Sequence, residues 1–199
     1  MDANRSQISP QALGAVLALL FALSLGWLIF NNARAGAEPL QVIFSAVLLA
    51  VPLSLLYYSI GLFVLSGQQR RARGRIAPDM ARALYITPRL AGLIIVLFVS
   101  MFALDAFQEG AGAWAMLLAF LLHALPAIVM AVLLVFAWRW EWIGFVAFAG
   151  AAVFFLVFFY RDPAQALGNF LIFSAPMAAV GLLFWANWKW KDSLIASGP

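Results

Sequence analysis

Six long apolar stretches constrain this chain more than any other feature, and together they occupy most of its 199 residues. A helix needs roughly 20 apolar residues to cross about 30 Å of hydrocarbon at a rise of 1.5 Å per residue. Each stretch is close to that length, with approximate limits at residues 12–30, 40–66, 90–107, 113–138, 142–160 and 170–188. The sequence therefore predicts an all-α, polytopic membrane protein with six transmembrane helices.

The composition agrees with this fold class and argues against several kinds of metal and cofactor site. Hydrophobic residues make up 66% of the chain and charged residues 10%, whereas roughly a quarter of the residues in a soluble domain are charged. The chain has no cysteine and one histidine, which excludes disulfides and sulfur ligands and argues against a zinc site or a haem with two axial histidines, except in a symmetric oligomer. We expect no metal and no cofactor.

Half of the basic residues lie in one connection, between the second and third apolar stretches. Cytoplasmic loops retain Lys and Arg, so this connection is predicted to be cytoplasmic, with both termini inside and the protein in a bacterial inner (plasma) membrane. A short juxtamembrane cluster is typical of contact with anionic lipid headgroups, and nucleic-acid binding would need a basic surface on a folded module. The cluster consists of Arg70, Arg71, Arg73, Arg75, Arg82 and Arg89.

The arginine-rich connection also divides the chain. The prediction is a two-helix unit over residues 1–66, a cytoplasmic linker over 67–89 and a four-helix unit over 90–199 with a short tail. Within the linker, Pro78 is expected to begin a short helix that lies along the membrane surface through Tyr85, because the residue before Pro88 disfavours helical backbone.

The first apolar stretch has to be distinguished from a cleaved signal peptide, because Ala33-Arg34-Ala35 resembles a peptidase site. Its apolar run is longer than a usual signal core, and Asp2 cancels Arg5 before it. We expect the helix to be retained; removal would leave five spans.

Small residues recur at every fourth position of the first stretch, as Gly14, Ala18, Ala22 and Gly26. In lipid, such a ridge allows two helix backbones to approach closely and stabilises their packing. The sequence predicts a tight crossing, either inside the bundle or between two copies of the chain.

Ionisable side chains within a membrane are costly, so each is a candidate functional group. His123 is expected about 15 Å below the outer surface, from the helical rise. Asp105 and Glu109 lie at the outer end of the third stretch. One interpretation is a proton or cation path from the two acids to His123; the other is a neutral histidine bonded to a backbone carbonyl freed by Pro126.

The second half of the chain resembles a known family. The residues that carry the likeness, over about 81–190, are Phe102 to Glu109, His123-Ala124-Leu125-Pro126, Ala137 to Gly144, Ser174-Ala175-Pro176 and Gly181 to Phe184. They are similar to a family of four-helix prokaryotic membrane domains with no assigned activity. The resemblance implies the architecture and adds Glu141 to the candidate polar site.

No nucleophile triad, phosphate loop or acid–base pair at one depth is evident, so an enzyme is the least favoured class. The leading hypothesis is a non-enzymatic accessory or scaffolding subunit that packs with itself or with a larger membrane protein. The alternative is a channel or carrier for a small ion, proton or solute that uses His123.

Overall fold

The computed structural model describes residues 8–107, 112–160 and 163–195, which form helices and connecting turns with no strand among them. Six helical spans are long and apolar enough to cross a membrane, which confirms the predicted fold class. The elements are α1 (Pro10–Arg34), α2 (Pro39–Arg73), α3 (Pro78–Ser100), the 3-10 helix η1 (Met101–Ala106), α4 (Ala113–Ala137), α5 (Glu141–Phe159), α6 (Pro163–Asn169), the π-helix η2 (Phe170–Ser174), α7 (Ala175–Lys189) and α8 (Lys191–Ile195).

The first three helices each begin at a proline, where the fixed φ suits the first turn and the missing N–H would have had no partner. The turns between them are closed by glycine: Gly36 has φ 84° and Gly74 has φ 68°, both in the left-handed region. These two turns make α1, α2 and α3 consecutive antiparallel neighbours.

The arginine-rich segment differs from its prediction, because most of it is helical. α2 continues to Arg73 and α3 begins at Pro78, so only residues 74–77 are non-helical. The expectation that a surface helix ends before Pro88 is wrong, since α3 runs through Pro88 to Ser100. A proline in a helix removes the hydrogen bond to the carbonyl four residues earlier; here that carbonyl, Leu84 O, accepts a hydrogen bond of 2.7 Å from Asn187 Nδ2.

The last span is built from three consecutive helical segments, α6, η2 and α7. Ala175 N–H donates to Phe170 O across the wider π turn, directly before Pro176. π turns and prolines are the usual causes of a bent helix. The predicted start at Phe170 was therefore late, because the helical path already begins at Pro163.

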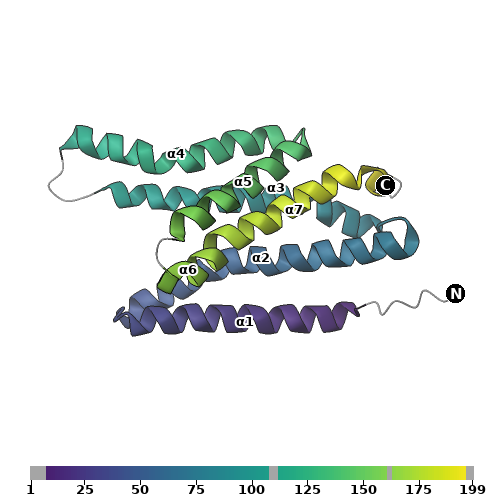
Figure 1. Ribbon diagram of the computed structural model, residues 1–199, viewed down its shortest axis with the longest axis horizontal. Coiled ribbons are helices and arrows are strands. Elements are labelled where there is room, and N and C mark those ends of the chain that lie inside the picture. The colour runs from purple at the N-terminus through teal and green to yellow at the C-terminus, as the bar shows by residue number, and fades with distance from the viewer. Residues whose placement is uncertain (1–7, 108–111, 161–162, 196–199) are drawn as a thin grey trace.

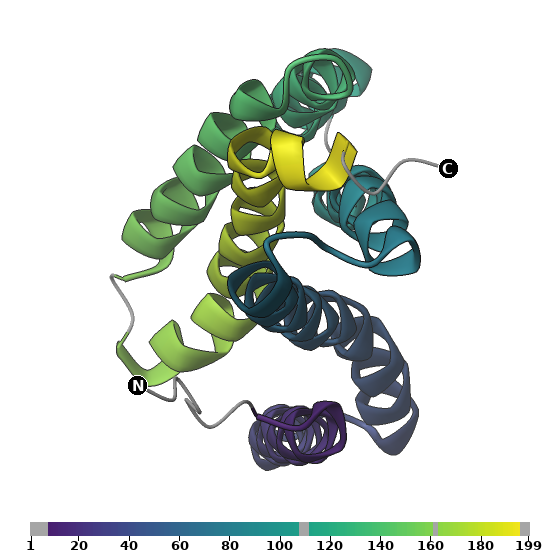
Figure 2. The same cartoon turned by 90° about the vertical axis from the view of Figure 1, so that its right-hand side faces the viewer.

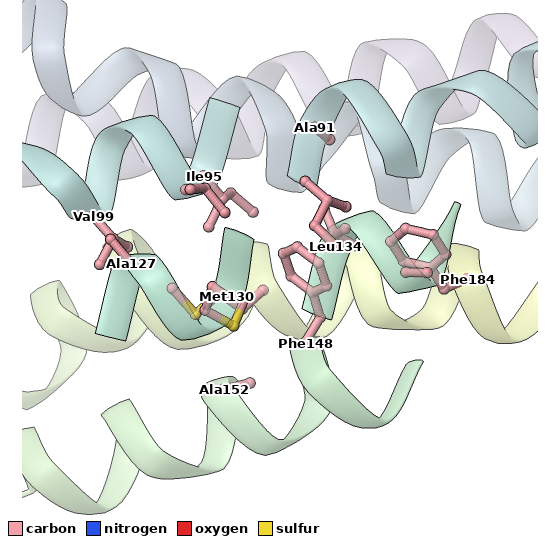
Figure 3. Close-up of a cluster of buried hydrophobic side chains, with 13 residues drawn as sticks. Ala91, Ile95, Val99, Ala127, Met130, Leu134, Phe148, Ala152 and Phe184 are labelled. Atoms are coloured by element: carbon pink, nitrogen blue, oxygen red, sulfur yellow. The ribbon is translucent and has the colours of Figure 1, made fainter. Parts of the chain in front are cut away.

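An apolar core joins α3, α4, α5 and α7 (Figure 3). Phe148 and Phe184 stack at its centre with ring centroids 5.7 Å apart, and both side chains are fully buried. Gly144 permits this packing, because a Cβ at that position would lie 2.6 Å from the Phe184 ring. Close approach at a small residue is how helices pack tightly in lipid.

α1 and α4 lie at opposite edges of the molecule, with α2, α3, α5 and α7 between them (Figures 1 and 2). α1 packs on α2. The ridge of small residues on α1 is exposed along its length, and nothing lies within 4 Å of a Cβ built at Gly14 or Gly26. Within one chain the ridge is open, so its use between two copies stays a prediction.

Candidate functional site: a buried ion pair at one end of the bundle

A cluster of charged side chains lies where α3, α5 and α8 meet. Arg89 Nη2 of α3 is 3.4 Å from Glu141 Oε1, and Lys191 Nζ of α8 is 3.3 Å from Glu141 Oε2. The side chains of Arg89 and Glu141 are only 7% and 9% exposed, whereas Lys191 is 57% exposed. One carboxylate therefore bridges a buried cation and a cation at the surface.

The hairpin between α4 and α5 positions this carboxylate. Glu141 is the first residue of α5, where the helix dipole favours an anion. Arg89 Nη2 also lies 3.3 Å from the carbonyl of Trp138, which ends α4 and belongs to the carbonyls that a helix leaves unpaired. The arginine thus binds both ends of the turn and ties α3 to the α4–α5 hairpin.

Aromatic rings enclose the guanidinium of Arg89. Its Cζ is 3.7 Å from the centroid of Tyr85 and 6.0 Å from that of Phe184, and Nη1 donates to Tyr85 O at 2.6 Å. A cation over an aromatic face gains electrostatic stabilisation, most of all when water is excluded. Arg89 Nε is buried without a hydrogen-bond partner in the described structure.

Asn187 of α7 supplies a second buried polar contact close to this cluster. Its Nδ2 donates to Leu84 O and, at 2.9 Å, to Leu183 O on its own helix. The side chain is 1% exposed, and no described residue donates to Oδ1. The asparagine satisfies the carbonyl that Pro88 leaves free, and so links α3 to α7.

The chemistry available to the cluster is limited. Its two cations share one carboxylate, and the donors of Arg89 are used mainly by backbone carbonyls. Among the residues that the structure describes, no three His, Asp or Glu side chains come close enough to hold a metal ion. The arrangement can hold four helices together, α3, α4, α5 and α8.

His123, the predicted centre of a polar path, lies on the exposed side of α4. Its Nδ1 is 2.8 Å from Ala119 O, a contact with a backbone carbonyl, although the carbonyl that Pro126 frees would be that of Leu122. His123 and Trp138 are about 22 Å apart along α4, from the helical rise. The structure therefore does not bring His123 and Glu141 together.

Asp105 and Glu109 are the other two residues of the predicted proton or cation path to His123. Asp105 belongs to the 3-10 helix η1, but its side chain and the whole of Glu109 lie outside the described residues.

The six arginines predicted to contact lipid separate into two groups. Arg70, Arg71, Arg73, Arg75 and Arg82 are exposed. Arg70 also bonds to Ser193 Oγ at 3.2 Å and lies 5.4 Å from the Trp190 ring. Arg89 is buried instead and contacts Glu141, so its side chain does not reach the lipid surface.

The sequence predicts Arg89 to be part of the linker because Pro88 is expected to end a helix. A usable signal was present: Arg89 and Glu141 each directly precede an apolar stretch, and those two stretches run parallel in a six-span topology. Opposite charges at the same end of two spans can pair, and the pairing lowers the cost of their burial.

In a comparison with protein families, residues 78–195 match the model of DUF7670, a domain of unknown function. The match covers more than half of the chain. The chain belongs to this family. In this chain the DUF7670 domain comprises α3 to α8, so it contains Arg89, Glu141, Asn187 and Lys191. Comparisons with curated proteins and with solved structures found no match.

Proposed function

We propose that this protein is a non-catalytic accessory or scaffolding subunit of an assembly in a prokaryotic inner membrane. The observation that carries the proposal is the closed interior of the DUF7670 domain. Buried side chains of α3, α4, α5 and α7 fill the space that a carrier would need for its substrate. The buried charges, Arg89 and Glu141, are paired with each other.

The exposed position of His123 also favours a scaffold over a carrier. A transport path requires a polar group that faces the interior or a water-filled cavity. His123 lies on the outer side of α4, and it does not line the groove beside α1, the small cavity around Pro52 or the hollow on α5 at Phe154. Proton flux should be the same in empty vesicles and in proteoliposomes that contain the wild type or His123→Ala. A flux that is present with the wild type and lost with His123→Ala would support a carrier instead.

Native mass spectrometry after extraction into lipid nanodiscs tests the scaffold. The expected result is a complex heavier than one chain of 21.8 kDa, either a defined homo-oligomer or a stoichiometric complex with another membrane protein. Recovery of the single chain under every mild extraction condition would contradict the proposal.

The proposed orientation places the arginine-rich end in the cytoplasm, with both termini inside. The ends of α2, α4 and α7 meet at that end of the bundle, and their basic residues are typical of a cytoplasmic face. Reporter fusions should place Gly74 inside the cell and Gly112 outside; the same side for both would contradict this topology.

A further inference from the structure

A groove of about 640 Å³ runs between α1, α2 and the start of α3. Its wall is mainly apolar, and α1 contributes small residues to it, including Gly14 and Ala18. Nothing lies within 4 Å of a Cβ built at Gly14, so the groove is open there, whereas Leu17 Cδ1 of α1 lies 3.0 Å from a Cβ built at Gly61 of α2. Near the deep end, the rings of Phe21 and Tyr57 meet edge to face at 6.3 Å.

The length of the groove matches one leaflet of a membrane. It extends from Pro10 to Phe21 on α1 and from Leu65 to Ser54 on α2, which is about 17 Å along each helix at 1.5 Å per residue. One leaflet contributes about 15 Å of the roughly 30 Å of hydrocarbon. The groove thus begins at the arginine-rich end and stops near mid-membrane.

The volume of the groove is sufficient for acyl chains. An extended acyl chain about 17 Å long and about 4 Å across, from carbon contact distances, occupies about 210 Å³. Both acyl chains of one phospholipid therefore fit into the groove.

One acidic side chain lines the mouth of the groove, and two basic residues lie close to it in the chain. Asp79 lines it, and Arg82 follows three residues later, which puts the two side chains on neighbouring positions of α3. Arg75 precedes α3 by three residues, and all three side chains are exposed. An acid beside two bases complements a headgroup that carries both an amine and a phosphate, whereas the neutral glycerol of phosphatidylglycerol offers no cation to Asp79.

We propose that the groove binds one aminophospholipid from the leaflet at the arginine-rich end, with its acyl chains between α1 and α2. The amine contacts Asp79, and the phosphate contacts Arg82 and Arg75. The bound lipid would fill the open groove bounded by α1, α2 and the start of α3.

The test measures lipids retained by the full chain after exchange in nanodiscs of equimolar phosphatidylethanolamine and phosphatidylglycerol. Gly14→Leu should fill the groove and lower retention about tenfold, equivalent to about 1.4 kcal/mol. Gly26→Leu is the matched control: it lies on the same open ridge, outside the groove, and should retain lipid as the wild type does. Ala18→Leu repeats the test from a second lining position if Gly14→Leu does not fold.

Asp79→Asn tests the headgroup. The wild type should retain phosphatidylethanolamine over phosphatidylglycerol, and the substitution should reduce that preference about twofold to fivefold, as expected for one exposed charge pair. Equal retention by the wild type and both groove-filling variants would overturn the proposal, as would a headgroup preference that Asp79→Asn leaves unchanged. If Gly14→Leu abolished an oligomer and left lipid retention unaltered, the groove would be a binding site for a protein partner. That result would also overturn the proposal.

Discussion

The DUF7670 domain and the N-terminal helix differ sharply in how they are held. In the most apolar 18-residue window of α1, 6% of the residues are buried, against 50% in the span that contains α3 and 56% in the span that contains α7. The two most buried spans are also the least apolar of the six. In lipid, apolar side chains gain little by leaving acyl chains, so small and polar residues decide which helices pack.

Polar contacts show the same difference between the two regions. Within the domain, α3 is tied to α5 by the Arg89–Glu141 pair and to α7 by Asn187. α1 is joined to α2 by two side-chain hydrogen bonds of 2.6 Å, Ser24 to Tyr57 and Asn32 to Ser45, both only partly buried. We therefore expect substitutions in the domain to lower stability far more than substitutions in α1.

The largest effect is expected from Glu141→Gln. It leaves Arg89 buried without its anion, and breaking a buried pair in this way costs about 3 to 5 kcal/mol. Thermal unfolding in detergent, followed by tryptophan fluorescence, measures the loss. The double variant Arg89→Met/Glu141→Gln should regain much of the stability because it removes the unpaired charge. If Glu141→Gln alone unfolded at the wild-type temperature, the Arg89–Glu141 pair would contribute nothing to the stability of the fold.

A smaller effect is expected from Gly144→Ala. The added Cβ would approach the buried Phe184 ring to 2.6 Å, and overpacking of this kind costs about 1 to 3 kcal/mol. Gly150→Ala on the same helix and Gly26→Ala on α1 are the controls, because nothing lies within 4 Å of either Cβ. Both controls should unfold at or slightly above the wild-type temperature. If Gly26→Ala lowered the unfolding temperature as much as Gly144→Ala, the two regions would not differ in how tightly they are packed.

Asn187→Leu should cost about 1 to 3 kcal/mol, because Leu84 O would stay buried without a donor. Pro88→Ala restores a backbone N–H that can donate to that carbonyl. Combining the two substitutions should therefore recover part of the stability in the same unfolding assay. Strictly additive losses would indicate that proline and asparagine act independently.

The smallest effect is expected in α1. Tyr57→Phe removes the hydrogen bond to Ser24, which in a membrane is worth about 0.6 kcal/mol. Hydrogen exchange should become faster in the amides of α1 and stay unchanged in α7. Tyr58→Phe serves as the control, because Tyr58 is 57% exposed and its hydroxyl bonds to no described residue. Faster exchange in both helices would show that α1 supports the domain.

The six spans could be predicted because their length and composition alone select lipid as the solvent. The continuation of α3 through Pro88 could not, since the donor that satisfies Leu84 O comes from Asn187, which lies 103 residues later. The local sequence shows that Pro88 lacks an N–H, but it does not show which other group donates to Leu84 O.

The place of His123 along α4 could be predicted, but the direction in which its side chain faces could not. α4 is apolar on all sides, so its sequence does not indicate which face turns inward. The ridge on α1 is a similar case: Gly14 and Gly26 indicate that a close approach is possible, and they do not identify what approaches. Glu141, which the resemblance singled out, could be placed at the end of a span, whereas its partner Arg89 was assigned to the lipid surface.

The length of α2 has one more consequence. Its 35 residues extend about 52 Å, which exceeds the roughly 40 to 45 Å of a bilayer with its headgroups. The helix must tilt strongly or project beyond the lipid, and its arginine-bearing last turns and the glycine turn that follows would project first. A helix that projects in this way would carry a short rigid segment into the aqueous phase, within reach of soluble proteins that never enter the membrane.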